Sequence, residues 1–230
     1  LGKARPMSLG ALKEGIGYVR RSPVIMWAML MDFFATFFGS GNVLLPIFAQ
    51  DILHVGAEGY GLLAAAPSLG SILSGVFMSL RRPFERMGLV MLVSVAVYGV
   101  ATVIFGLSQS FWLSLFIFSL TGAGDTVSMI LRQTIRQLAT PDYLRGRVTA
   151  INTLFAMGGP QLGELEAGIV AALWGAPMAM VTGGIGCLIV VAVVAKVAPA
   201  LREYCGEGLG GAPVLLSGAS PPQTTVVAGE

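Results

Sequence analysis

The sequence predicts an all-α membrane protein with six transmembrane helices and both termini in the cytoplasm. Composition is the first reason: 11% of the 230 residues are charged and 55% are hydrophobic, with a mean hydropathy of +0.79. So few charged side chains cannot cover a soluble globule of this size. The second reason is six apolar stretches of about 20 residues, the length that crosses about 30 Å of hydrocarbon. The third is that lysine and arginine occur only in alternate connections.

The same composition excludes several classes of protein. A soluble enzyme, a disulfide-stabilised scaffold and a disordered chain all disagree with it, and a net charge of +2 gives no reason to expect a nucleic-acid partner. Cys187 and Cys205 have no metal-ligand spacing and no plausible bridge, and His54 is the only histidine. We therefore expect no cofactor, no metal site and no enzymatic activity, since no nucleophile lies beside a base within the spans.

We place the six spans at residues 23–49, 59–80, 87–107, 110–131, 148–172 and 176–198. Glycine and proline interrupt three of them. In the first, Gly39 and Pro46 predict a kink near Asn42–Pro46, because proline removes a backbone donor. Pro67 interrupts the second span and Pro160 the fifth. Broken helices persist in lipid only where neighbouring helices or a cavity satisfy the freed carbonyls, so we expect a packed bundle around a cavity.

The 14 basic residues set the orientation of the bundle. They occur in groups of five before the first span, three between the second and third, four between the fourth and fifth, and two after the sixth. The connections around 50–58, 107–110 and 173–175 contain none. Because positively charged connections stay in the cytoplasm, both termini are predicted to lie there.

Two segments flank the bundle, which occupies residues 23–200. Residues 1–22 are predicted to be a cytoplasmic amphipathic linker in which 8–21 form an interfacial helix capped by Ser8; a merely solvated linker explains the pattern equally well. Residues 201–230 are rich in Gly, Pro, Ser and Thr and are predicted to be a flexible cytoplasmic tail.

Two aspartates within the spans are candidates for proton coupling. A charge at mid-bilayer costs about 2.5–3.5 kcal/mol, so one that persists faces a cavity or a partner. Asp32 and Asp125 are expected roughly 13 and 10 Å from the cytoplasmic ends of their spans, at about 1.5 Å per residue. Asp125 precedes Arg132 by two helical turns, and a structural pair between them is an open alternative to a proton site. Asp32 has no basic neighbour in the sequence, so we expect it to exchange protons.

Polar residues of the fifth span are candidates for a substrate path. Gln161 and Glu164 share one helix face at a spacing of three residues, whereas Glu166 lies about 200° from Glu164. We assign Gln161 and Glu164 to the cavity and Glu166 to a helix contact or the interface; a purely structural pair is an equal alternative. The Gly-Gly-Ile-Gly run at 183–186 has no strand before it, which predicts close helix packing and not dinucleotide binding.

Residues 132–168 carry a resemblance to a known family; they read RQTIRQLATPDYLRGRVTAINTLFAMGGPQLGELEAG. The RGRV segment followed by GGPQLGELEAG resembles the major facilitator superfamily, and in particular the bacterial branch that contains enterobactin-exporter and macrolide-efflux proteins. The opening SLGALKEGIGYVRRSPVI resembles that branch's central cytoplasmic segment. Residues 75–88 match its short cytoplasmic loop motif weakly, because the motif's aspartate is missing. The resemblance covers roughly residues 8–200.

The resemblance implies roles for arginines in the connections. In the family, such arginines hold the inward gate; the corresponding candidate gating residues here are Arg81, Arg82, Arg145, Gly146 and Arg147. Plain orientation anchors are the alternative. Thr140 is expected to cap a short helix that begins at Pro141 and precedes the fifth span.

The resemblance also implies a missing half. Family members have twelve helices in two six-helix halves with the substrate between them, and this chain resembles the second half. The start at Leu1 predicts a fragment; the alternative is a chain that pairs with a second copy. The expected partners are the lipid bilayer, a small-molecule substrate, protons, and the N-terminal six-helix half or a second copy.

Together these features predict the C-terminal half of a proton-driven antiporter of the bacterial inner membrane. It would export drugs, siderophores or other amphipathic small molecules by alternating access. Asp32 and Asp125 are the proton-coupling candidates, and Asn42, Gln161 and Glu164 are the substrate-path candidates. A non-transporting six-helix membrane module, with its polar residues used in packing, is the alternative function.

Overall fold

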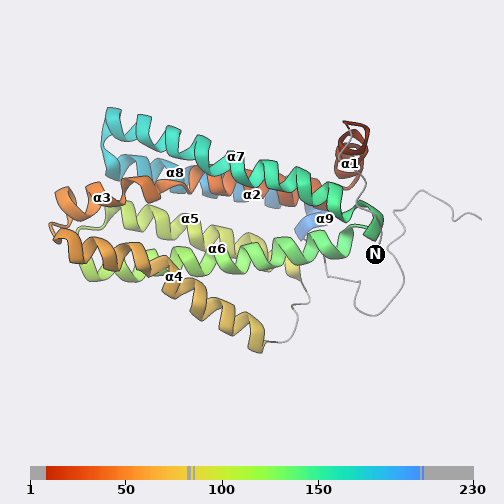
Figure 1. Cartoon of the computed structure of the whole chain (residues 1–230). Coiled ribbons are helices and arrows are strands. Elements are labelled where there is room, and N and C mark those ends of the chain that lie inside the picture. Colours follow the sequence, from red (N-terminus) through yellow and green to blue (C-terminus); the bar gives the residue numbers. More distant parts are fainter. Residues whose placement is uncertain (1–8, 82–83, 85, 203, 205–230) are drawn as a thin grey trace, which may run out of the picture.

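The computed structural model describes residues 9–81, 84, 86–202 and 204, with side chains from Glu14 onward, and these residues are helical without strands. The longer helices are α1 (Leu9–Arg21), α2 (Pro23–Phe38), α4 (Gly56–Leu80), α5 (Met87–Leu107), α6 (Phe111–Ala139), α7 (Asp142–Trp174) and α8 (Ala176–Val197). Six of them, α2 and α4 to α8, lie lengthwise beside one another in two layers (Figure 1). One layer contains α7, α2 and α8, and the other contains α5, α6 and α4.

Five segments in the described part of the chain are long and apolar enough to cross a membrane: Pro23–Ile52, Gly56–Leu80, Met87–Leu107, Phe111–Ala139 and Ala176–Val197. The chain is therefore a multi-pass membrane protein, as predicted. The fifth predicted span corresponds to α7, which has 33 residues but is not among these segments. Gln161, Glu164 and Glu166 lower its apolar character, so its membrane crossing stays a prediction.

The first span is broken, as the sequence predicts. α2 ends at Phe38, and the chain continues through a 3₁₀ turn, η1 (Gly41–Leu44), a short α3 (Leu45–Ile47) and a π turn, η2 (Phe48–Ile52). The break begins at Gly39, earlier than the predicted kink at Asn42–Pro46. Pro46 lacks a backbone N–H and cannot restore regular helix bonding there. As a result, Asn42 is exposed at the break.

The region between the fourth and fifth predicted spans differs from expectation. α6 continues to Ala139 and does not stop at residue 131, so Arg132 lies inside the helix with 7% of its surface exposed. The expected short helix before the fifth span is wrong, because α7 is continuous from Asp142. Thr140 does not cap it: among the described residues its buried Oγ1 has no hydrogen-bond partner. Pro141, expected at the first helical position, is the residue before the helix.

The apolar core falls into separate clusters along the bundle. The first joins α2, α5, α6 and α8 near the end where α2 begins, and its most buried side chains on these helices include Met31, Met91, Ile135 and Cys187. The second lies at the opposite end, where Phe48 and Phe118 pack on Phe105 with ring centroids 4.8 and 4.6 Å away. A third cluster joins α1, α2 and α7. The first two clusters leave a layer between them at the middle of the bundle.

Glycines set the closest helix contacts. A Cβ on Gly163 of α7 would overlap the Phe37 carbonyl oxygen of α2, and one on Gly70 of α4 would overlap that of Ser119 on α6. The prediction that the run at 183–186 serves helix packing is confirmed: a Cβ on Gly184 would lie 2.8 Å from the Gly99 carbonyl oxygen of α5. Small residues of this kind let membrane helices approach at backbone distance.

α4 packs along α6 over only part of its length. Pro67 lies inside it, and the second half of the helix tilts away from α6 (Figure 1). Large apolar side chains on this half are exposed, among them Leu73 at 72% and Leu80 at 83%. In a membrane protein such a surface contacts lipid or another helical unit.

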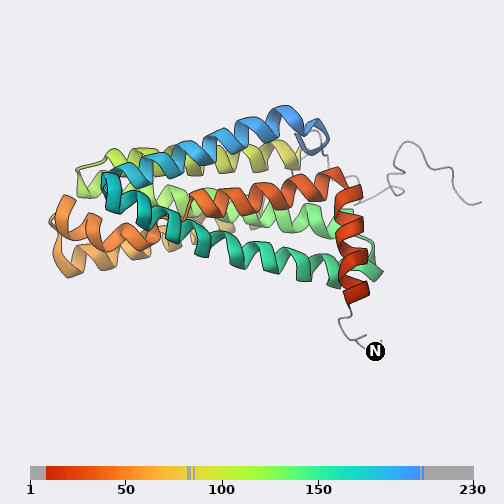
Figure 2. The same ribbon diagram turned by 90° about the horizontal axis from the view of Figure 1, so that it is seen from above.

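The flanking segments pack on the bundle. α1 is a helix, as expected, and it runs crosswise over one end of the bundle (Figure 2). Ser8, its predicted cap, lies outside the described residues. At the other flank, α9 (Pro199–Arg202) buries Leu201 completely, so the predicted start of a tail at residue 201 lies too early. The rest of the predicted tail, except Tyr204, falls outside the described residues.

Candidate functional site

A polar cleft occupies the middle layer between the two larger apolar clusters. Its cavity of about 170 Å³ is lined by residues of four helices and of η1: Ala35, Thr36, Gly39, Ser40, Asn42, Val95, Tyr98, Asp125, Ser128, Arg132, Pro160 and Glu164. Asn42, Asp125 and Glu164 are all exposed, so the cavity opens on the surface of the bundle. We call this cavity the central cleft.

A three-membered ion network crosses from α2 to α6 beside the central cleft. The Nη1 atom of Arg132 lies 3.1 Å from Oδ1 of Asp32, and its Nη2 atom lies 3.5 Å from Oδ1 of Asp125. The Arg132 and Asp32 side chains are 8% and 16% exposed, whereas that of Asp125 is 54% exposed. The buried charges of Arg132 and Asp32 stabilise each other, because a buried charge persists only with a partner. Asp125 presents its carboxylate to the cleft.

This network changes the interpretation of Asp32, for which no basic partner was expected, and tests the expected pair of Asp125 with Arg132. Although Asp32 has no basic neighbour in the sequence, Arg132 supplies a cation to it from another helix. The contact of Asp125 with Arg132 two turns later is present. One guanidinium reaches both aspartates, so they lie at a similar level along the bundle; their depth in the membrane stays a prediction. Their roles in proton coupling stay predictions.

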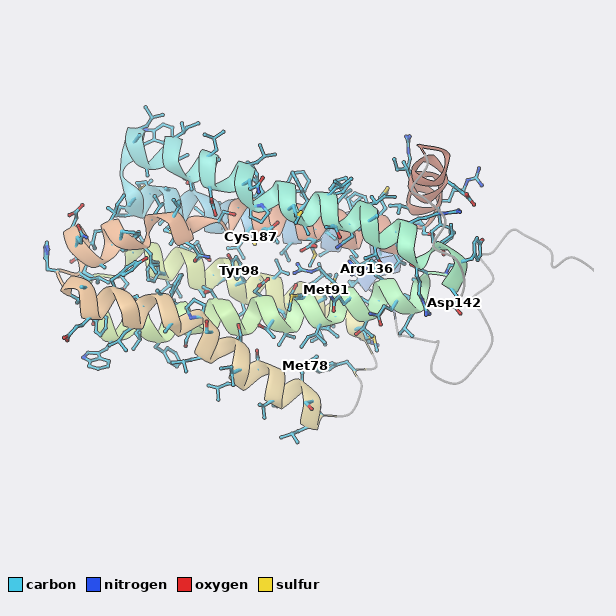
Figure 3. All side chains as sticks on the ribbon, viewed as in Figure 1. Met78, Met91, Tyr98, Arg136, Asp142 and Cys187 are labelled. Atoms are coloured by element: carbon cyan, nitrogen blue, oxygen red, sulfur yellow. The ribbon has the colours of Figure 1, made fainter. Side chains whose placement is uncertain are left out.

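A second cavity of about 140 Å³ adjoins the first, on the side of α4. The two cavities share four lining residues, Gly39, Asn42, Tyr98 and Asp125. Figure 3 shows Tyr98 at the middle of the bundle, with Arg136 nearer the end where α1 and α9 lie. The Tyr98 hydroxyl donates to the Gly39 carbonyl oxygen at 2.7 Å, which ties α5 to the point where α2 breaks.

The predicted substrate-path residues are brought together in part. Asn42 and Glu164 both line the central cleft, from η1 and α7. Gln161 is exposed one turn before Glu164 but does not line the cavity. Glu166 is half-buried elsewhere on α7, in agreement with its assignment away from the cavity. The helix face carrying Glu164 is therefore the one that meets the cleft.

Two of the predicted gating arginines, Arg145 and Arg147, lie near the start of α7 and do not line the central cleft. Arg145 pairs with Asp142 at 2.8 Å and donates to the Gln137 carbonyl oxygen at 3.3 Å, which joins the start of α7 to the end of α6. Arg147 pairs with Glu14 of α1. A Cβ on Gly146 would meet open space.

Arg81, directly after α4, has a different kind of partner from the arginines of α7. The Arg81 guanidinium lies 4.6 Å from the ring centroid of Phe84 and 5.7 Å from that of Phe77, within cation–π range. Arg82 lies outside the described residues. The structure therefore links the α7 arginines to α1 and α6, and Arg81 to aromatic rings of its own segment.

Sequence reasoning missed two residues of the cleft, Tyr98 and Ser128, and the contact of Arg132 with Asp32. The spacing of Arg132 from Asp125 indicates a contact between those two, but no pattern in the sequence relates Arg132 to Asp32. Tyr98 and Ser128 lie in apolar stretches without any distinguishing pattern, and only the packing of α5 and α6 brings them to the cleft.

Comparisons with known proteins agree with a helical membrane fold. The sequence profile of the transmembrane secretion effector family matches residues 5–205. The enterobactin exporters EntS of Citrobacter koseri, Escherichia coli and Shigella dysenteriae are each 27% identical over 200 residues, a match that covers 87% of this chain and 48% of each relative. The chain thus spans about half the length of the curated relatives it matches. It belongs to the transmembrane secretion effector family of the major facilitator superfamily.

Proposed function

We propose that the chain is one six-helix half, the C-terminal one, of a proton-coupled exporter of drugs, siderophores or other amphipathic small molecules. The observation that carries this proposal is the ion network of Asp32, Arg132 and Asp125 beside an open polar cleft. Charges inside a membrane protein are costly and mark ion or substrate pathways. The family assignment supports transport and argues against an enzymatic role.

The proposed topology has six spans, both termini in the cytoplasm, and a location in the bacterial inner membrane. α7 is the remaining span, the fifth along the chain, because it packs lengthwise against α2 and α8 although its sequence is more polar. The end of the bundle where α2 and α7 begin faces the cytoplasm, since Arg145 and Arg147 lie there. This end is called the cytoplasmic end below.

A second six-helix unit completes the site. The central cleft is open, with Asn42, Asp125 and Glu164 exposed, and charged side chains in a membrane do not face lipid. The complementary unit is the N-terminal half or a second copy of the chain, since the relatives are about twice as long. We call this chain together with its complementary unit the complete transporter.

Proton coupling follows from the unequal exposure of the two aspartates. Asp125 is the exposed member, so it exchanges protons with the cleft, while Asp32 holds Arg132 in place. Protonation of Asp125 leaves Arg132 bound to Asp32 alone, which strengthens the link between α2 and α6 because Asp125 no longer competes for the guanidinium. A change in that link favours one of two arrangements of the bundle, which is what alternating access requires. The arginines at the cytoplasmic end, with Arg82, would stabilise the closed inward gate.

The test is efflux driven by a pH gradient in membrane vesicles that contain the complete transporter, with ethidium as the fluorescent probe. We expect Asp125→Asn to abolish gradient-driven efflux and Glu166→Gln, a neutralised acid away from the cleft, to leave it unchanged. Full gradient-driven efflux with both Asp32→Asn and Asp125→Asn would remove the proposed coupling. No efflux by the unmodified protein with any amphipathic probe would favour a non-transporting module.

A further inference from the structure

α1 lies across the cytoplasmic end of the bundle, in the position of a helix at a membrane surface. Figure 1 shows it nearly end-on, on the outer side of the layer that contains α7, α2 and α8, and level with the start of α7. Figure 2 shows the same helix running crosswise to α2 and α7. Because the long helices cross the bilayer, a helix that lies crosswise at their cytoplasmic ends runs along the membrane surface.

One face of α1 is fixed to the bundle. Val19 is 9% exposed and belongs to one apolar cluster with Leu144 and Val148 of α7. The Tyr18 hydroxyl donates to the Ala139 carbonyl oxygen at the end of α6, at 2.7 Å. α1 is therefore attached both to the end of α6 and to the start of α7.

The face of α1 that is turned away from the bundle is basic and exposed. Arg20 and Arg21 are exposed, and the apolar side chain of Ile16 is 43% exposed beside them. The two arginines follow Gly17 by three and four residues, so they flank it on the helix surface. A Cβ on Gly17 would meet nothing within 4 Å, so this face is open. Long cationic side chains around an apolar one are typical of a helix at a membrane interface.

The charges of this face have no compensation from the protein. In the ranges that the structure describes, neither Arg20 nor Arg21 forms an ion pair. Glu14, the acidic residue of α1, is engaged by Arg147 of α7. Two positive charges therefore point outward at the level of the lipid headgroups. Basic residues close to a membrane surface attract anionic phospholipids, so the charge and position of this face match such lipids.

We propose that the outer face of α1, formed by Ile16, Gly17, Arg20 and Arg21, binds the headgroups of anionic phospholipids. The arginines contact headgroup phosphates, and Ile16 enters the boundary between headgroups and acyl chains. The inference goes beyond the proposed transport function and takes from it only the assignment of this end to the cytoplasm. Because the other face of α1 is fixed to α7, bound lipid holds the start of α7 at the membrane surface.

The experiment measures which lipids lie next to α1 when the complete transporter is in nanodiscs. Gly17→Cys in a Cys205→Ser background accepts a bimane label, because a side chain at this position meets open space and Cys187 is buried. Nitroxide-labelled phosphatidylglycerol or nitroxide-labelled phosphatidylcholine is a minor component in nanodiscs of phosphatidylcholine. We expect bimane to be quenched severalfold more strongly by the phosphatidylglycerol label, and higher ionic strength should reduce this preference.

Variants of the arginines identify the groups responsible. Arg20→Gln with Arg21→Gln should abolish the preference for the anionic lipid. Arg20→Lys with Arg21→Lys should retain it, since lysine binds phosphate as a point charge. The matched control is Arg86→Gln with Lys196→Gln, which removes two exposed cations at the cytoplasmic ends of α5 and α8 and should leave the preference unchanged.

Equal quenching by both lipids would overturn the inference, and so would a preference that survives Arg20→Gln with Arg21→Gln. Weak quenching by both labels would also overturn it, because water or the complementary unit would then cover this face. Inorganic phosphate that abolishes the preference at constant ionic strength would assign the face to free phosphate in place of a lipid surface. The assay uses neither a pH gradient nor a transported substrate, so its failure leaves the proposed transport function standing, and a failure of efflux leaves the lipid site standing.

Discussion

Arg132 of α6 lies 3.1 Å from Asp32 of α2, although 100 residues separate them in the sequence. The guanidinium also reaches Asp125 on its own helix at 3.5 Å. It is the charge that joins the two layers of the bundle at the edge of the central cleft. A single substitution at this position therefore tests the network directly.

Replacement of Arg132 by methionine should destabilise the protein strongly. The change leaves two carboxylates without a cation, and removal of one partner of a buried ion pair costs about 3–5 kcal/mol. Thermal melting in detergent measures the loss. The matched control is Arg145→Met, since the exposed pair of Arg145 with Asp142 is worth about 0–1 kcal/mol. Adding Asp32→Asn to Arg132→Met should restore part of the loss; equal stability of the two single variants would contradict the network.

Two glycines of α7 should respond in opposite directions to the same substitution. A Cβ on Gly163 would overlap the Phe37 carbonyl oxygen of α2, whereas one on Gly168 would meet nothing within 4 Å. Gly163→Ala should therefore push the helices apart at a cost of about 1–3 kcal/mol. Gly168→Ala should be neutral or stabilise by up to about 1 kcal/mol, because alanine favours helix. Melting temperatures in one detergent compare them, and the same loss in both would show that α7 does not pack on α2 at Gly163.

α1 should be released from the bundle when its ion pair is reversed. Glu14 pairs with Arg147 of α7, and the Tyr18 hydroxyl donates to the Ala139 carbonyl oxygen at 2.7 Å. Glu14→Arg places two positive charges together and should speed hydrogen exchange across α1, while global stability falls by no more than about 1 kcal/mol. The double variant with Arg147→Glu restores the pair and should restore protection. If it fails to do so, the Glu14–Arg147 contact does not hold α1.

Thiol labelling from the two sides of the membrane should show α7 crossing it. Tyr143 and Trp174 are exposed near opposite ends of α7, at 73% and 66%. In a Cys205→Ser background, Tyr143→Cys should react with a membrane-impermeant maleimide only from the cytoplasmic side and Trp174→Cys only from the outer side. Cys187, which is buried, provides the unlabelled baseline. Reaction of both positions from the same side would refute six spans.

Local rules predicted the helices better than their ends. The apolar stretches at 87–107 and 176–198 match α5 and α8 almost residue for residue, since lipid selects length and apolarity directly. α6 extends beyond its predicted span, because Arg132 and Arg136 lower the hydropathy of the sequence but do not end the helix. Of the site, Asn42, Asp125 and Glu164 were predictable because polar residues inside apolar stretches stand out.

The sequence by itself determined the class, the position of the long helices, the break in the first span and the grouping of basic charge. Each depends on neighbours along the chain and on how lipid treats apolar and charged residues. Only the tertiary structure decided that Asp32 has a cation, that Gln161 misses the cleft and that Tyr98 and Ser128 reach it. These facts depend on distances between separate helices, which are set by backbone contacts at glycines such as Gly163 and Gly70, and no local pattern encodes those distances.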